Sequence, residues 1–354
     1  MNSYILNHQW ATRPSDERFT SMQALHDYNV QKRSISTERG VALDHMQVLP
    51  TEAGDMMFCA QGQSAGAQLS NWAFGQLCIR AGAPAAYLRS LPAQLAAVPL
   101  QWSIEHAEHQ DAKVLLRKNG HWGADAITST TYGRIYDAQV SDAILSAVDL
   151  NRWKIPSASY ASKDPKKATT LYASDRDMFV CLVDDSRPIE VPGRNGQDTL
   201  FRGFIVRNSE VGAAALDISL FLYRYICDNR IIWGMQSERS LKIRHTSGGP
   251  MRFVREANPA LLEYAAADTR ETVDIVLNAQ KREVGKDPVE VRAWLKARGF
   301  TQEQSTVAIK NAEESGENPR AVWGLVQGLT AAAHDIPFGD ERFAFERKAG
   351  ALLG

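Results

Sequence analysis

The segment from residue 211 to residue 227, VGAAALDISLFLYRYIC, constrains the fold most, because as a helix it would be apolar on nearly every side. Apolar residues recur in it at spacings of three and four, and others between them widen the stripe. We predict a buried central helix over 211–227 that ends at Asp228-Asn229. Such a helix must be covered on most sides, so the rest of the chain has to pack around it.

Alternating apolar and polar residues predict strands on both sides of this helix. Three strands, 169–173, 178–183 and 200–207, precede it, and a strand with one basic face, 241–246, follows it. In the first half we expect a strand at 46–60, helices at 68–81, 85–90 and 141–148, and a hairpin that turns at Asn119-Gly120. A second long helix is predicted from 258 or 259 to 282.

The C-terminal part carries helix-start signals. Pro288 and Asn318-Pro319 begin helices, and Thr301 with Gln304 forms a capping box. The predicted fold class is therefore α+β, an antiparallel sheet with helices packed on one face plus a C-terminal helical module. We divide the chain into an extended N-terminal arm at 1–40, an α+β core domain at 41–286 and the helical module at 287–354.

Composition excludes several classes. No apolar run approaches the ~18 residues that a membrane span needs, and the start of the chain shows no pattern of a secretion signal. The four cysteines lie far apart in apolar surroundings, as buried thiols do in a reducing cytosol. We therefore expect a cytoplasmic protein without a membrane partner. The net charge of −1 means that any nucleic-acid binding has to come from a local excess of cations.

Such an excess lies between residues 202 and 255, where nine basic residues stand against four acidic ones, a net charge of +5. Cationic strands with aromatic neighbours suit phosphate backbones and stacked bases. A sheet whose solvent face happens to be basic would give the same pattern. The basic loop at 163–167 and the aromatic residues Tyr132 and Tyr172 allow the same two interpretations.

Other motifs are weaker. Gly62-Gln63-Ser64-Ala65-Gly66 matches the G-x-S-x-G of a serine hydrolase. The fold of such hydrolases places several strands and an oxyanion glycine motif before that serine, whereas the sixty residues before Ser64 supply at most one strand and no such motif. His106 and His109 have metal-like spacing without further specified ligands. Neither a phosphate-loop motif nor a C-x-x-C pair occurs. These absences favour a binding protein without metal or cofactor.

Several segments together carry a resemblance to a family. They are ALDHMQVLP, QLSNWAFGQLCIRAGAPAAYLRSLP, TSTTYGRIYDAQVSDAIL, DRDMFVCLVDD, SLKIRHTSG and NPRAVWGLVQGLTAAAH. Over about residues 40 to 335 the chain resembles the phage/plasmid-like proteins grouped as domain of unknown function 932, a family label that implies no chemistry. The order of strands and helix also resembles, at the level of fold, single-strand annealing proteins of the RecT and Red-beta type, although those look more basic.

We therefore predict a non-enzymatic protein that binds or anneals single-stranded DNA as a homo-oligomer, for which a ring is one form, in recombination or replication of mobile elements. The alternatives are a phage or plasmid scaffold protein and, third, a hydrolase that uses Ser64. DNA and RNA are not distinguished. The predicted contact residues are Lys166, Lys167, Arg202, Arg207, Lys242, Arg244 and His245, with Tyr132, Arg134 and Tyr172 as secondary candidates.

Overall fold

The structure is a computed structural model that describes residues 14–62, 65–108, 111–156, 169–193, 196–224, 229–233, 241–266, 270–336 and 339–354. These residues form two mostly antiparallel sheets and a set of helices. The predicted α+β class is confirmed. The second sheet, however, is not part of the prediction.

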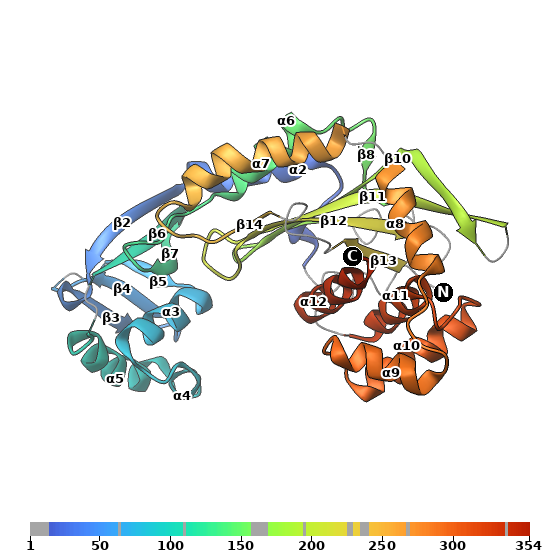
Figure 1. Ribbon diagram of the computed structural model, residues 1–354. Coiled ribbons are helices and arrows are strands. Elements are labelled where there is room, and N and C mark those ends of the chain that lie inside the picture. The colour runs from blue at the N-terminus through green and yellow to red at the C-terminus, as the bar shows by residue number, and fades with distance from the viewer. Residues whose placement is uncertain are drawn as a thin grey trace.

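The larger sheet, called sheet A, has the strand order β1-β9-β10-β11-β12-β13, with β14 paired to β12 and β8 paired to β10. Its strands are β1 (Arg18–Phe19), β8 (Trp153–Lys154), β9 (Leu171–Ala173), β10 (Met178–Gly193), β11 (Gly196–Asn208), β12 (Leu216–Arg224), β13 (Asn229–Trp233) and β14 (Leu241–Ile243). The strands β10 and β11 form a long hairpin that pairs from Met178 with Asn208 to Gly193 with Gly196. Figure 1 shows this hairpin projecting beyond the rest of the sheet.

The smaller sheet, sheet B, has the order β2-β6-β7-β5-β4-β3. Its strands are β2 (Ser36–Ala42), β3 (Met46–Pro50), β4 (Met56–Ala60), β5 (Ala67–Leu69), β6 (Asp111–Asn119) and β7 (His121–Thr128). The hairpin β6–β7 turns at Gly120, whose φ of +75° is the left-handed conformation that glycine adopts without strain. This confirms the hairpin predicted from Asn119-Gly120.

Helices cover both sheets. They are α2 (Met22–Ser34), α3 (Asn71–Ala81), α4 (Ala85–Arg89), α5 (Ala93–Glu105), α6 (Asp137–Ala147), α7 (Gly249–Ala266), α8 (Arg270–Lys281), α9 (Pro288–Ala297), α10 (Gln302–Glu314), α11 (Val322–Ala332) and α12 (Gly339–Gly350). Helix α9 begins at the predicted Pro288, and Thr301 caps α10 through the predicted capping box. The third C-terminal helix, α11, begins at Val322 and not at the predicted Asn318-Pro319. The predicted helix at 258–282 is two helices, because α7 already begins at Gly249 and α8 follows it.

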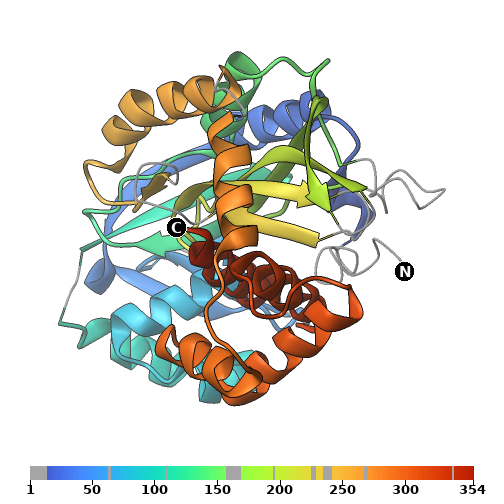
Figure 2. The same cartoon turned by 45° about the vertical axis from the view of Figure 1, so that its right-hand side comes forward.

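The elements are arranged as an arch (Figure 1). Helices α2, α6 and α7 lie along one face of sheet A at the top. Sheet B with α3, α4 and α5 forms one leg, and α9 to α12 form the other. Figure 2 shows α8 running down from the level of α7 to the C-terminal helices. The largest apolar core lies between sheet A and the helices, and a separate core lies between sheet B and α3 to α5.

The prediction of a central helix over 211–227 is wrong, because the described residues 216–224 form strand β12. Leu220 and Leu222 point to the large core, whereas Phe221 joins a smaller apolar cluster on the opposite face. A strand that is buried on both faces is apolar at successive positions, as a buried helix is, so periodicity does not distinguish the two.

The prediction of an extended arm is wrong over residues 22–34, which form α2. The buried side of this helix carries Met22, Leu25, Asn29 and Lys32. Two of these four residues are polar, so the helical period is not visible as a pattern of hydrophobicity. The predicted strands 178–183 and 200–207 are confirmed as parts of β10 and β11, and β9 confirms residues 171–173 of the predicted strand 169–173.

Candidate nucleic-acid interface

A single row of directly opposed residues crosses sheet A from strand to strand. The row consists of Arg18, Tyr172, Phe179, Arg207, Asp217 and Lys242, on β1, β9, β10, β11, β12 and β14. Because directly opposed residues share a face of the sheet, these six side chains leave the sheet on one side. We call this set the cross-strand row. It brings together three of the predicted contact residues, Tyr172, Arg207 and Lys242.

Exposure divides the cross-strand row. The side chain of Lys242 is exposed and that of Arg207 is half-buried, so both reach the surface. Tyr172 is only 1% exposed and packs against Phe179 at a ring-centroid distance of 6.2 Å. Its ring therefore belongs to the apolar cluster of this face and does not stack on a ligand at the surface. Asp217 accepts a hydrogen bond from Arg347 of α12 at 3.1 Å.

The predicted strand 241–246 is shorter in the structure, where β14 ends at Ile243. Arg244, the next residue, is exposed like Lys242. The chain then enters α7, whose first turns carry the exposed Arg252 and Arg255. Both of these arginines pair with the same carboxylate, that of Glu256, at 2.7 and 3.1 Å. Residues 242–256, which we call the β14–α7 corner, thus carry four exposed cations against one acid.

The side chains of Arg134 and His245 are buried, and that of Tyr132 is half-buried. The Arg134 guanidinium is buried, and its Nε donates to Glu38 at 2.8 Å. The rings of Tyr132 and His245 stack at 5.1 Å with an interplanar angle of 6°. Backbone N–H groups of Gly133 and Ile135 donate to the carbonyl oxygen and Nδ1 of His245, at 3.1 and 3.3 Å. These residues join the loop after β7 to the end of β14.

Burial lowers the pKa of His245 from 6.5 to about 4. Between these values the unfolded chain binds a proton that the folded chain does not, so stability is lost as the pH falls. We expect the free energy of unfolding of the wild type, relative to His245→Gln, to fall by about 3 kcal/mol between pH 7 and pH 4. Urea unfolding of both proteins at pH 7, 5.5 and 4 measures this. A difference that stays constant over the range would contradict it.

Next to these residues lies a buried ionic cluster that sequence analysis missed. Its acids are Glu210, which follows β11, and Asp137, the first residue of α6; its cations are Lys32 of α2 and Arg117 of β6. Lys32 Nζ lies 2.8 Å from Asp137 Oδ2 and 3.8 Å from Glu210 Oε1. Arg117 Nη2 donates to Glu210, and the Asp137 backbone N–H donates to Glu210 at 2.8 Å. We call these four residues the ionic junction, because they connect sheet A, sheet B and two helices.

The pKa values of the two acids in the ionic junction shift in opposite directions. Burial raises the pKa of Asp137 more than the neighbouring Lys32 lowers it. Burial would also raise the pKa of Glu210, but Lys32 and Arg117 hold that pKa below its ordinary value. Glu210 is therefore the firmly ionised acid of the junction. Its one signal in the sequence is an acidic residue between a strand and an apolar run in an otherwise basic stretch.

Several sequence motifs lie outside the residues that the structure describes. They are Lys166 and Lys167 of the basic loop, Ser64 of the G-x-S-x-G motif and His109. His106 is described, and its ring stacks on Trp102 at 4.3 Å. Within the described part of the chain, no group of three or more metal-ligating side chains comes together. In the same part no helix is long and apolar enough to cross a bilayer.

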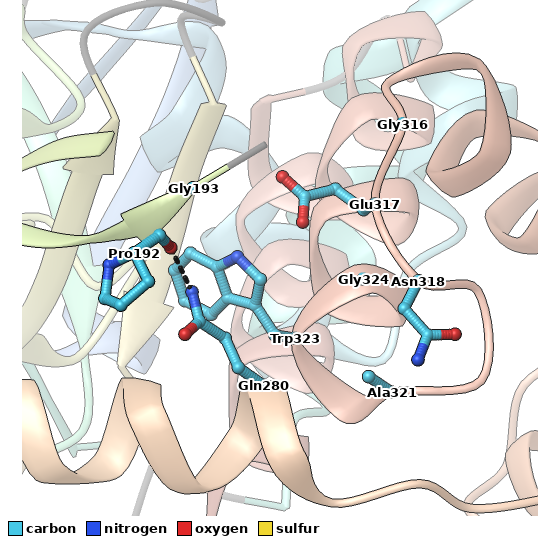
Figure 3. Close-up of a pocket in the computed structure, with 9 residues that line it drawn as sticks. All are labelled: Pro192, Gly193, Gln280, Gly316, Glu317, Asn318, Ala321, Trp323 and Gly324. Atoms are coloured by element: carbon cyan, nitrogen blue, oxygen red, sulfur yellow. Dashed lines mark hydrogen bonds between the residues drawn. The ribbon is translucent and has the colours of Figure 1, made fainter. Parts of the chain in front are cut away.

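Two surface cavities are lined by other residues. A cavity of about 390 Å³ lies beside the ionic junction and is lined by Tyr28, Lys32, Arg117, His121 and Asp125, among others. A second, of about 230 Å³, lies between the β10–β11 hairpin and the C-terminal helices (Figure 3). There the Gln280 amide lies beside the Trp323 indole and donates to the Pro192 carbonyl at 2.7 Å. None of the predicted contact residues that the structure describes lines either cavity.

Comparison with known proteins gives one match. The profile of the family described as Domain of unknown function (DUF932) matches residues 162–314. This range contains β9 to β14 and α7 to α10, hence most of sheet A and the β14–α7 corner. No curated protein and no solved structure matches the chain.

Proposed function

We propose that this protein binds single-stranded DNA through the β14–α7 corner. The observation that carries the proposal is the group of four exposed cations, Lys242, Arg244, Arg252 and Arg255, opposed by Glu256 alone within residues 242–256. Neutralisation of phosphates by Lys and Arg releases counterions and supplies affinity without sequence preference. The half-buried Arg207, on the same face of sheet A as Lys242, extends the cationic surface along the cross-strand row.

The cellular role is part of the same proposal. The resemblance to phage and plasmid proteins and to annealing proteins supports a function in recombination or replication of mobile elements in the bacterial cytoplasm. We further propose that the protein works as a homo-oligomer. The exposed apolar residues Met251, Val254 and Leu262 on α7 offer a surface for self-association.

We expect Lys242→Ala/Arg244→Ala to weaken binding of single-stranded DNA and to lower the salt slope of the affinity by about 1.4, since each lost contact removes ~0.7. Folding should barely change, because substitutions of exposed charges usually stay within about 0.5 kcal/mol. Binding of labelled oligothymidylate at five salt concentrations, together with thermal melts, measures both quantities.

Lys281→Ala/Lys286→Ala is the matched control, because it removes two exposed cations elsewhere. It should leave the slope unchanged. An equal slope in the wild type and the Lys242/Arg244 variant, with both folded, would remove this corner from the DNA site. If the wild type itself bound no DNA, the scaffold function would replace the proposal.

A further inference from the structure

Arg202 lies on the face of sheet A that is opposite to the cross-strand row. It is directly opposed to Asp184 of β10 and Leu222 of β12, and Trp153 of β8 opposes Asp184 in turn. Its side chain is 2% exposed, and its guanidinium lies 5.3 Å from the ring centroid of Tyr264 on α7. Arg202 is therefore enclosed between the sheet and α7 and does not extend the β14–α7 corner.

Two N–H groups of this guanidinium have no hydrogen-bond partner among the residues that the structure describes. Within the described part of the chain, Nε and Nη2 of Arg202 are buried and form no hydrogen bond. Asp184, the acid opposite Arg202, accepts no hydrogen bond from these two groups, because its oxygens bind other donors. Its Oδ2 accepts from Arg152 Nε at 2.7 Å, and its Oδ1 accepts from Ser186 Oγ at 2.7 Å. The Tyr264 ring offers its face and so compensates the charge only in part.

The charged groups near Arg202 are also mostly positive. Arg152 and Arg187 act electrostatically on Arg202, as does Asp184. Two cations and one acid thus act on Arg202. Burying an ionised group without a partner is strongly unfavourable, and folded chains rarely retain one unless something compensates it. Burial also lowers the pKa of Arg202, in agreement with an incompletely compensated cation.

The two unpaired groups have a defined geometry. Nε–H and one Nη2–H lie on the same edge of a guanidinium and point in parallel. This edge is one of those with which arginine binds two oxygens of a phosphate or carboxylate at once. The excess of positive charge around Arg202 favours the more highly charged of these anions, the phosphate group.

We propose that Arg202 is the centre of a phosphate-binding site between sheet A and α7, with Arg187 adding positive potential. Nε and Nη2 donate to two oxygens of one phosphate group. This site does not depend on the proposed function, because inorganic phosphate, a phosphate ester or a nucleic-acid backbone would offer the same oxygens.

The test is a titration of the full-length chain with inorganic phosphate at constant ionic strength, followed by calorimetry and by thermal melts, with chloride as the reference anion. We expect one phosphate per chain and a rise in melting temperature. Arg202→Met, which keeps the length of the side chain and removes its charge, should weaken phosphate binding at least about tenfold, the effect of one charge-assisted hydrogen bond. It should also melt no lower than the wild type in chloride.

Arg202→Lys keeps the charge but loses the two-point edge, so it should bind phosphate more weakly while remaining folded. If Arg202→Met does not fold, phosphate binding by Arg202→Lys is the measurement that tests the proposal. Absence of phosphate binding by the wild type would overturn the proposal, as would equal binding by a folded Met or Lys variant.

Two further ligands distinguish the sources of the phosphate group. Binding of deoxythymidine monophosphate that is lost in the Arg202 variants would support a free phosphate ester as ligand. Oligothymidylate binding that is lost in these variants, while Lys242→Ala/Arg244→Ala retains it, would support a backbone phosphate at Arg202. The phosphate titration needs no DNA, so a failure of DNA binding at the β14–α7 corner leaves its result unaffected.

Discussion

We expect Glu210→Gln to lower the free energy of unfolding by about 3–5 kcal/mol, the usual cost of removing one partner of a buried ion pair. Glu210 accepts from Arg117 and from the Asp137 backbone N–H, and Lys32 lies 3.8 Å away. The glutamine is almost isosteric, so the loss would come from the two cations that stay buried. Urea unfolding at pH 7 measures it.

A double variant separates charge balance from packing. Lys32→Met/Glu210→Gln removes one cation and one acid together, so the net charge of the ionic junction stays the same. Its unfolding free energy should lie well above that expected from adding the effects of the two single substitutions. A loss below about 1 kcal/mol for Glu210→Gln alone would show that the junction contributes little to stability.

Leu222→Ala is expected to lower the free energy of unfolding by about 2–5 kcal/mol, through lost burial and the cavity left behind. Leu222 is 1% exposed in the middle of β12 and belongs to the large core. This is a large part of a stability of typically ~5–15 kcal/mol, so poor solubility is expected as well. The midpoint of urea unfolding and the yield of soluble protein measure the two effects.

Val254→Ala is the matched control, because it shortens an aliphatic side chain that is 68% exposed on α7. Its urea midpoint should stay close to that of the wild type. If Leu222→Ala left the midpoint unchanged too, β12 could not be a central core strand.

Leu222 shows what a single sequence can and cannot predict. Its burial follows from composition alone, because a run as apolar as 211–227 has to be covered in any fold. Whether the run is a helix or a strand does not follow, because both faces of β12 are buried and the alternation that marks a strand is absent. The pairing of β12 with β11 decides it, and that pairing is a contact between segments.

Some predicted contact residues are exposed and others are buried, and local sequence does not distinguish the two groups. Lys242 and Arg244 were recognised through local alternation, and both are exposed. Arg202 and Arg207 belong to one basic strand, but β11 turns them to opposite faces, one under α7 and one on the cross-strand row. A sequence shows which side chains are charged and therefore need a polar partner or water. It does not show whether such a side chain pairs with another residue or is solvated.

The sequence by itself determined the α+β class, the strands 178–183 and 200–207, residues 171–173 of a third strand, the hairpin at Gly120 and the starts of α9 and α10. Each of these follows from interactions between residues close in the chain. Only the tertiary structure decided that 216–224 is a strand, that α2 is a helix and that Glu210, Asp137, Lys32 and Arg117 meet. Lys32 and Glu210 are far apart along the chain, and the free energy of their contact depends on burial that exists only once both sheets are in place.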